Sequence, residues 1–443
     1  MSNFKTKYAL VGTGSRANMF IEPLVSKFRD DSELVALSDP NPSRLSFYNS
    51  DLKEKHEYNN VPTFHSDDFR KMITQTKPDV VIVTTIDAMH HHYIVQALEM
   101  GCDVITEKPM TIDAEKCDEI IRAVEKSGKK LRVAFNYRWA PGATKVKELL
   151  LKETIGEILH VDMEYWLNTS HGADYFRRWH REKDKSGGLI VHKSTHHFDL
   201  VNWWTNSVPE TVFGFGKLGF YGRKNAESRG EEISYTRYHG NETSDDPFAL
   251  SLDSDQRMKS LYLDAEKHDG YFRDRNVFGD NISIEDSMSL LIQYRTGITL
   301  NYSLNAYLPR EGFNIAFNGT KGRIEYEENH KSSLMGSTTV QKDQSIPTYR
   351  HRLIVRPIFH SPYEVDVEDG IGGHGGGDQL LQERIFRTFE EPDKFGRDAG
   401  HEQGAASMLV GSAANKSFES GLPEQISKIC KPFTTKKLLS ELI

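Results

Sequence analysis

The sequence has few of the features that mark secreted, membrane-spanning or nucleic-acid-binding proteins. It holds three cysteines in 443 residues, far apart and odd in number, so neither a disulfide framework nor a cysteine metal site is indicated. No apolar run is long enough to span a bilayer, and the first apolar run begins at Tyr8, which leaves no room for a signal peptide. Basic residues number 56 against 64 acidic ones, which argues against nucleic acid or an anionic membrane as a partner. We therefore expect a cytoplasmic protein with reduced thiols and no nucleic-acid or membrane partner.

The length and the order of elements indicate an α/β protein of two domains. At 443 residues, with 37% hydrophobic and 27% charged residues, the chain is typical of a multidomain globular protein. Over residues 1–136, short apolar runs alternate with helical segments, which predicts a doubly wound parallel sheet. Over residues 137–443, long alternating stretches with two-residue breaks predict a sheet that is mostly antiparallel. Residues 222–281 are polar and form an inserted excursion, in which we expect a helix near 255–268.

The chain opens with a turn that is typical of dinucleotide binding. The apolar run Tyr-Ala-Leu-Val leads into GTGSRA at 12–17, so a strand precedes the glycines and a helix can follow. Gly12 permits the tight turn, and Gly14 lets backbone N–H groups approach a pyrophosphate. The helix that opens at Ser15 and Arg16 would face the phosphates with its partial positive charge.

An acidic residue at the end of the second predicted strand supports NAD as the cofactor. Asp39 follows the run ELVALS and comes 22 residues after Ala17. At this place an acid can bind both ribose hydroxyls of NAD, and its charge repels a 2′-phosphate. Arg44, five residues further on, keeps NADP as an alternative.

Five motifs spread over most of the chain resemble those of the Gfo/Idh/MocA oxidoreductases, named for glucose–fructose oxidoreductase and inositol dehydrogenase. They are GTGSRA at 12–17, TIDAMH at 85–90, TEKP at 106–109, NYR at 136–138 and GGLIVHKSTHHFD at 187–199. The resemblance implies an N-terminal Rossmann domain and a C-terminal α/β domain whose large open sheet forms a homodimer or homotetramer interface. It also implies NAD(P)-dependent oxidation of a sugar or cyclitol hydroxyl, or the reverse reduction.

The resemblance further implies roles for individual residues. Lys108 is similar in position to the family's lysine at the nicotinamide edge, and His196 to its catalytic histidine. Arg138 lies at the domain junction, and His192 departs from the pattern, since the family commonly has an aspartate there. The predicted cofactor-binding residues are Gly12, Gly14, Ser15, Arg16, Asp39, Thr85, Asp87, His90, Glu107 and Lys108.

The chemistry of these side chains suits hydride transfer from a secondary alcohol. The reaction requires removal of the hydroxyl proton and a fixed geometry at the nicotinamide. His196 suits the general base, since imidazole titrates near neutrality, and Lys108 can stabilise developing alkoxide charge. On one helix over 188–205, His192 would share a face with His196 and serve as a substrate contact or relay.

Each of these residues also has a structural interpretation. Lys108 could be a solvated strand-end lysine, and the two histidines could be interior groups bonded to the backbone. Their spacing also suits zinc, but no third ligand is evident, so no metal is predicted. Further predicted substrate contacts are Arg138, Lys193 and His374.

Three functions remain open on these grounds. The first is an NAD(P)-dependent dehydrogenase of a sugar, sugar derivative or cyclitol. The second is a redox-assisted glycosidase, in which transient ketone formation labilises the glycosidic bond. The third is a cofactor-bound sugar sensor without turnover, against which the retention of both Lys108 and His196 speaks.

Overall fold

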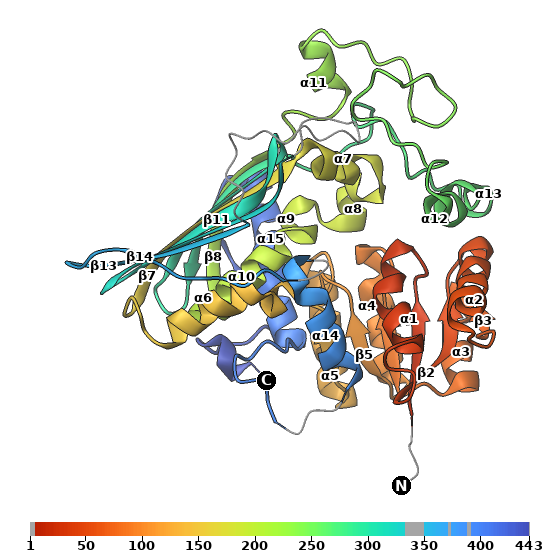
Figure 1. The fold of residues 1–443 in the computed structure, drawn as a ribbon, viewed down its shortest axis with the longest axis horizontal. Coiled ribbons are helices and arrows are strands. Elements are labelled where there is room, and N and C mark those ends of the chain that lie inside the picture. The colour runs from red at the N-terminus through yellow and green to blue at the C-terminus, as the bar shows by residue number, and fades with distance from the viewer. Residues whose placement is uncertain (1–4, 333–349, 371–373, 388–390, 443) are drawn as a thin grey trace.

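The computed structural model describes residues 5–332, 350–370, 374–387 and 391–442. Its N-terminal part is a six-stranded sheet in the order β3-β2-β1-β4-β5-β6, in which every neighbouring pair is parallel (Figure 1). The predicted doubly wound α/β domain is therefore confirmed. Its strands are β1 Thr6–Val11, β2 Ser32–Ser38, β3 Thr63–Phe64, β4 Val80–Val83, β5 Asp103–Thr106 and β6 Leu131–Val133. Its helices are α1 Asn18–Val25, α2 Pro42–His56, α3 Phe69–Thr76, α4 His90–Glu99 and α5 Ala114–Ser127.

Local sequence accounts for the limits of these elements. The apolar runs of β1 and β4 are buried because helices flank the parallel sheet (Figure 1). Helix α5 begins where the side chain of Asp113 accepts a hydrogen bond from the backbone N–H of Lys116 at 2.9 Å. It ends at Gly128, which has a φ of 64°. This left-handed conformation is common for glycine at the end of a helix and rare for other residue types.

The second sheet has nine strands in the order β14-β13-β12-β11-β7-β10-β9-β8-β15. All neighbours are antiparallel except β7 and β10, so the mostly antiparallel sheet is also confirmed. The strands are β7 Ile158–Asn168, β8 Pro209–Lys217, β9 Ser287–Tyr294, β10 Thr299–Leu308, β11 Arg310–Gly319, β12 Gly322–Ser332, β13 His351–Pro357, β14 Tyr363–Glu364 and β15 Glu424–Gln425.

Helices cover one face of this sheet, on the side of the first domain (Figure 1). They include α6 Pro141–Leu151, α9 Leu189–His192, α10 Thr195–Thr205 and α15 His401–Ser420. Along β9, buried and exposed side chains alternate, so that Leu290 packs inward while Leu291 is 56% exposed on the opposite face. Phe215 of β8 is 66% exposed, which leaves large apolar side chains on the outer face.

Two segments from the C-terminal part of the chain return to the first domain. Helix α14 Gly377–Phe386 packs there, with Phe386 5.3 Å from the ring of Tyr8 and Glu383 paired with Lys27 at 2.7 Å. The excursion 222–281 begins with α11 Arg223–Ser228 and then reaches α2 of the first domain (Figure 1). The helix expected near 255–268 is present as three short pieces, α12 Gln256–Met258, the π-helix η6 Lys259–Leu263 and α13 Glu266–Asp269.

The remaining α-helices lie between β7 and β8 of the second sheet or near the C-terminus. They are α7 Thr169–Arg177, α8 Lys183–Ser186 and α16 Ile426–Ile429. No helix in the described part of the chain combines the length and apolar character needed to cross a bilayer. All three cysteines are buried with free thiols.

Candidate active site at the junction of the two sheets

The turn after β1 has the geometry that a bound pyrophosphate requires. Gly12 has φ +94°, and a Cβ atom there would lie 2.6 Å from the backbone carbonyl carbon of Thr84. At Gly14 the nearest atom to such a Cβ is the hydroxyl of Tyr262 at 3.6 Å, so its backbone can be approached closely. The one-turn helix η1 Ser15–Ala17 and α1 follow at once. These residues fit a dinucleotide, whose phosphates the N–H groups of this turn would hold.

Asp39 lies beside this turn at the end of β2 and is 4% exposed. Its carboxylate accepts hydrogen bonds from the backbone N–H groups of Thr13 at 2.7 Å and Asn41 at 2.8 Å. Burial raises the pKa of Asp39, while the guanidinium of Arg44 and the two backbone hydrogen bonds oppose that rise. The acid therefore occupies the place predicted for a ribose-binding residue.

Part of the excursion packs directly on this region. We call residues 256–269 the strap. The backbone N–H of Ser15 donates to the hydroxyl of Tyr262 at 2.9 Å. Leu261 is fully buried within the hydrophobic core of the first domain. Sequence reasoning missed these contacts because 247 positions separate Ser15 from Tyr262, and no periodic pattern links the two segments.

Three other predicted cofactor-binding residues make hydrogen bonds within or between the loops around this turn. Arg16 Nε donates to Oε1 of Glu107 at 2.6 Å. Thr85 donates its hydroxyl to the carbonyl of Ile86 at 3.2 Å. Both residues are partly exposed, whereas Glu107 is 5% exposed.

His90, also predicted to bind the cofactor, is 1% exposed. Its Nδ1 lies 2.8 Å from the carbonyl oxygen of Pro109, and its Nε2 lies 3.2 Å from that of Thr85. Burial lowers the pKa of His90. Both ring nitrogens face backbone carbonyls, so the side chain of His90 connects the loops after β4 and β5.

Three ionisable side chains from both domains converge beside the dinucleotide turn. Nδ1 of His192, on α9, lies 2.5 Å from Oδ2 of Asp87, which follows β4. Nζ of Lys108, which follows β5, lies 3.5 Å from Nε2 of His192 and 3.2 Å from its carbonyl oxygen. These partners assign the proton of a neutral His192 to Nδ1, which donates to Asp87, while Nε2 accepts from Lys108.

Burial dominates the electrostatics of this cluster. It lowers the pKa of Lys108 to about 8, and the nearby carboxylates of Asp87 and Glu107 limit the fall. Burial also raises the pKa of Asp87 well above its usual range, against the attraction of Lys108. The pKa of His192 is well below its usual range because the ring is buried and lies beside Lys108. Strongly perturbed groups that converge in this way are characteristic of catalytic sites.

His192 and His196 do not lie on one continuous helix, contrary to the prediction for 188–205. The backbone N–H of Ser194 bonds to the carbonyl of Leu189, five residues earlier, and the Ser194 hydroxyl accepts from Tyr302 at 2.8 Å. Helix α9 therefore ends at His192 and α10 begins at Thr195. The ring of His196, 2% exposed, packs 4.5 Å from that of Tyr137.

Arg138 and Lys193, predicted as substrate contacts, are both buried. Arg138 is fully buried and holds Asp199 through two hydrogen bonds of 2.6 and 2.7 Å, with a third to Gln403 at 2.7 Å. Its guanidinium is therefore engaged in a buried network within the protein. Lys193 Nζ lies 3.5 Å from the hydroxyl of Tyr137, and burial lowers its pKa to about 8. His374 begins the turn His374–Gly376, but its side chain lies outside the described residues.

Aromatic side chains form a wall around His192. The ring of His180 lies 4.3 Å from that of His192, and the rings of Tyr175 and Trp179 lie 5.5 and 6.0 Å away. His180 was missed because the polar loop that holds it has no periodic signal. In the described residues, no group of three or more His, Cys, Asp or Glu side chains is placed to hold a metal ion.

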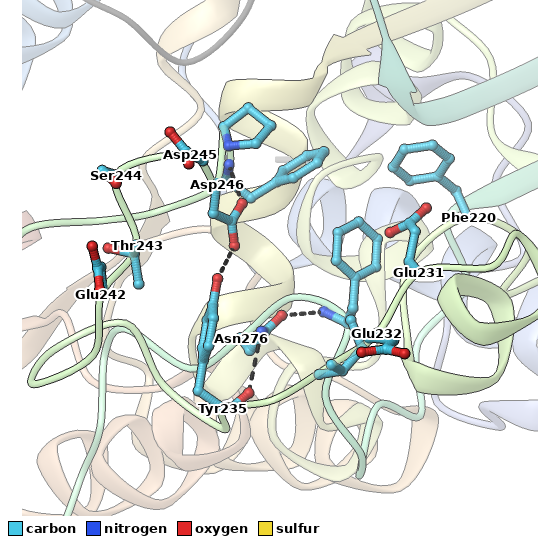
Figure 2. A pocket seen from close by; sticks show the side chains of 14 residues that line it. Phe220, Glu231, Glu232, Tyr235, Glu242, Thr243, Ser244, Asp245, Asp246 and Asn276 are labelled. Atoms are coloured by element: carbon cyan, nitrogen blue, oxygen red, sulfur yellow. Dashed lines mark hydrogen bonds between the residues drawn. The ribbon is translucent and has the colours of Figure 1, made fainter.

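A separate hollow of about 660 Å³ lies within the excursion (Figure 2). Phe220, Phe248 and Phe278 contribute apolar walls, and the rest of the lining combines carboxylates with neutral polar and smaller apolar side chains. Tyr235 donates its hydroxyl to Asp246, and Asn276 donates to the main chain of Tyr235, as Figure 2 shows. Among the residues that the structure describes, those lining this hollow include none of the predicted catalytic or cofactor-binding residues.

Comparison with known families decides which proteins this arrangement belongs to. Residues 6–135 match the model of an oxidoreductase family's NAD-binding Rossmann fold, and residues 147–426 match the C-terminal alpha/beta domain of the same family. The chain belongs to the Gfo/Idh/MocA oxidoreductases. The resemblance inferred from the sequence motifs is confirmed, as is NAD as the cofactor class.

Individual relatives of this Gfo/Idh/MocA oxidoreductase agree with that result. YteT of Bacillus subtilis, named as an oxidoreductase, is 37% identical over 428 residues, which cover 93% of this chain and 96% of that protein. D-glucoside 3-dehydrogenase of Escherichia coli is 34% identical over 158 residues, 36% of this chain and 42% of that protein. The WlbA dehydrogenase of Bordetella pertussis, solved with NADH and UDP-GlcNAcA, shares the fold with a TM-score of 0.60 at 17% identity, covering 95% of this chain and 98% of that chain.

Proposed function

We propose that this chain is an NAD-dependent dehydrogenase acting on a secondary hydroxyl of a sugar, sugar derivative or cyclitol. The observation that carries the proposal is the convergence of Lys108 from the first domain with His192 from the second, beside the dinucleotide turn. Among the relatives, the D-glucoside 3-dehydrogenase and the dehydrogenase solved with a nucleotide sugar support a carbohydrate substrate.

The proposed roles follow from position and charge. A bound nicotinamide would supply the hydride chemistry. The ammonium of Lys108 holds the reacting oxygen and stabilises the negative charge that develops on it. For His196, which is buried beside the ring of Tyr137, we propose the role of general base that the family resemblance implies. His192 fixes the position of Lys108 and is itself oriented by Asp87.

The aromatic wall supports a sugar-like substrate. Trp179 is half-buried, and its ring stacks 3.6 Å from that of His180. The apolar face of a sugar ring can stack on such a surface while its hydroxyls reach the charged groups. Phe176 and Tyr165 are fully buried and belong to the core, so they are not part of this surface.

A panel of sugars and cyclitols tests the activity, with NADH formation followed at 340 nm in parallel with NADP. We expect Lys108→Met and His196→Gln each to lower kcat/KM by roughly 100-fold or more while NADH binding, measured by fluorescence, persists. Lys126→Met, an exposed lysine on α5, is the matched control. Unchanged turnover in both site variants would show that these roles are wrong.

A redox-neutral glycosidase is the second candidate, and the strap favours it. A cycle in which the hydride returns to the product needs a cofactor that stays bound, and the strap, which is anchored to the first domain by the buried Leu261, would slow its release. Cleavage of a nitrophenyl glycoside with no net NADH would support this reaction. Net NADH formation in proportion to the oxidised sugar would support the dehydrogenase instead.

The outer face of the second sheet supports a homo-oligomer, as the family resemblance implies. A depression of about 500 Å³ lies on this face and is lined by residues of β8, β9, β10, β7 and β11. Phe215 and Leu291 border it with more than half of their surfaces exposed. A second copy of the chain would bury these apolar side chains, and we propose a homodimer or homotetramer through this face.

A further inference from the structure

The strap reaches the adenosine side of the dinucleotide site as well as its phosphate side. Asn41 donates its side-chain amide to the carbonyl of Ala265 at 3.0 Å and to Asp269 at 2.8 Å. Asn41 follows Asp39, the predicted ribose-binding acid, by two residues. The strap therefore borders the site where the two cofactors NAD and NADP differ, namely the 2′ position of the ribose.

Arg44 is the one residue near Asp39 that was predicted to accept a 2′-phosphate, and the strap engages it. Its Nη2 lies 2.8 Å from Oδ2 of Asp269, and its Nε donates to the carbonyl of Leu261 at 3.1 Å. Its Nη1 lies 3.5 Å from Asp39. With 11% of its side chain exposed, Arg44 is held between two carboxylates and a carbonyl, all of which would repel a phosphate.

We propose that the strap completes the dinucleotide-binding site and that Asp269 makes this site selective for NAD over NADP. Asp269 acts in two ways, because it occupies the guanidinium of Arg44 and adds a second negative charge beside Asp39. In this respect Asp269 is a specificity-determining residue supplied by the second domain. The proposal goes beyond the dehydrogenase activity, since it concerns binding alone.

Tyr262 makes a separate contribution that both cofactors share. The single N–H of Ser15 can donate to the hydroxyl of Tyr262 or to a phosphate oxygen, but not fully to both. The pyrophosphate is common to NAD and NADP. A change at Tyr262 should therefore alter the affinity for both dinucleotides by the same factor.

Calorimetric titration of the full-length protein with NAD and with NADP tests the proposal without any substrate. We expect the natural protein to prefer NAD, and Asp269→Asn to raise the affinity for NADP relative to NAD by about tenfold or more. Asp264→Asn is the matched control, since Asp264 lies on the same strap and pairs with Lys259 of the strap itself. Thermal melts verify that each variant is folded.

A second variant traces the effect to Arg44. In the Asp269→Asn background, Arg44→Ala should remove the gain in NADP affinity, because the freed guanidinium is what would bind the phosphate. Tyr262→Phe should change the affinity for NAD and NADP equally. Four results would each overturn the proposal. Two are that the natural protein prefers NADP, or that Asp269→Asn leaves the ratio of NADP affinity to NAD affinity unchanged. The others are that Asp264→Asn changes this ratio as much as Asp269→Asn does, or that the gain in NADP affinity persists after Arg44→Ala. Failure to bind either dinucleotide would overturn it too, whereas loss of turnover with intact NAD selectivity would concern only the proposed dehydrogenase.

Discussion

Nδ1 of His192 and Oδ2 of Asp87 lie 2.5 Å apart, although 105 positions separate the two residues in the sequence. This contact joins α9 of the second domain to the loop after β4 of the first. It also leaves only the ring of His192 between the carboxylate of Asp87 and the ammonium of Lys108. The negative charge of Asp87 raises the pKa of Lys108. The charge state of Lys108 thus depends on a residue that the sequence analysis assigned to the cofactor loop.

Replacing Asp87 by Asn should shift the pH dependence of the reaction. The Asn side chain can still accept from His192 but carries no charge, so the pKa of Lys108 should fall below its value of about 8. Since the proposed role of Lys108 needs its protonated form, the alkaline limb of the kcat/KM profile should move to lower pH. We also expect kcat/KM at its optimum to fall by roughly tenfold. Asp67→Asn, at a side chain that is 91% exposed, is the control, and an alkaline limb at the same pH in both variants would contradict the coupling.

The two glycines of the dinucleotide turn should differ in their response to alanine. A methyl group at Gly12 would meet the backbone of Thr84 at 2.6 Å, and the φ of +94° is unfavourable for alanine. Gly12→Ala should therefore lower the melting temperature as well as NADH binding. Gly14 has an ordinary φ of −73°, so Gly14→Ala should weaken NADH binding and leave the melting temperature nearly unchanged. Fluorescence titration and thermal melts measure the two effects, and a destabilised Gly14→Ala would contradict the assignment.

The buried ion pair between Arg138 and Asp199 should be costly to break. Asp199→Ala leaves a guanidinium that is fully buried without its carboxylate, and such losses cost about 3–5 kcal/mol of unfolding free energy. The double variant Arg138→Met with Asp199→Leu should recover much of that loss, because neither charge is then buried alone. Urea denaturation measures the difference. Asp118→Ala, which removes an exposed helix pair with Arg122, should change stability little, and an equal loss there would refute the interpretation.

The exposed face of the second sheet should control the oligomeric state. Phe215→Asp places a charge where a second copy would bury an apolar ring, so the native mass measured by light scattering should fall toward that of the monomer. Leu422→Asp tests for general surface effects, since Leu422 is 62% exposed but lies outside this face. A mass that is unchanged in Phe215→Asp, or equally reduced in both variants, would rule out this face as the interface.

Elements with strong local signals could be predicted from the sequence with small errors at their ends. The apolar run before Gly12 is β1, and the acid of the second predicted strand is at the end of β2. In each case the deciding interactions lie within a few residues, as in a glycine turn, a buried run or a helix cap. Helix α9–α10 could not be predicted as two pieces, because Tyr302 stabilises the break at Ser194 from 108 positions away.

The sequence by itself determined the dinucleotide turn, the acid that follows it, the two kinds of sheet and the family, because short-range patterns carry these features. Only the tertiary structure decided which charges meet. It pairs Lys108 with His192, buries Arg138 against Asp199 and brings Asp269 to Arg44. Such pairings depend on how two domains and one excursion pack together, and burial then sets their pKa values. No local pattern in the chain records either effect.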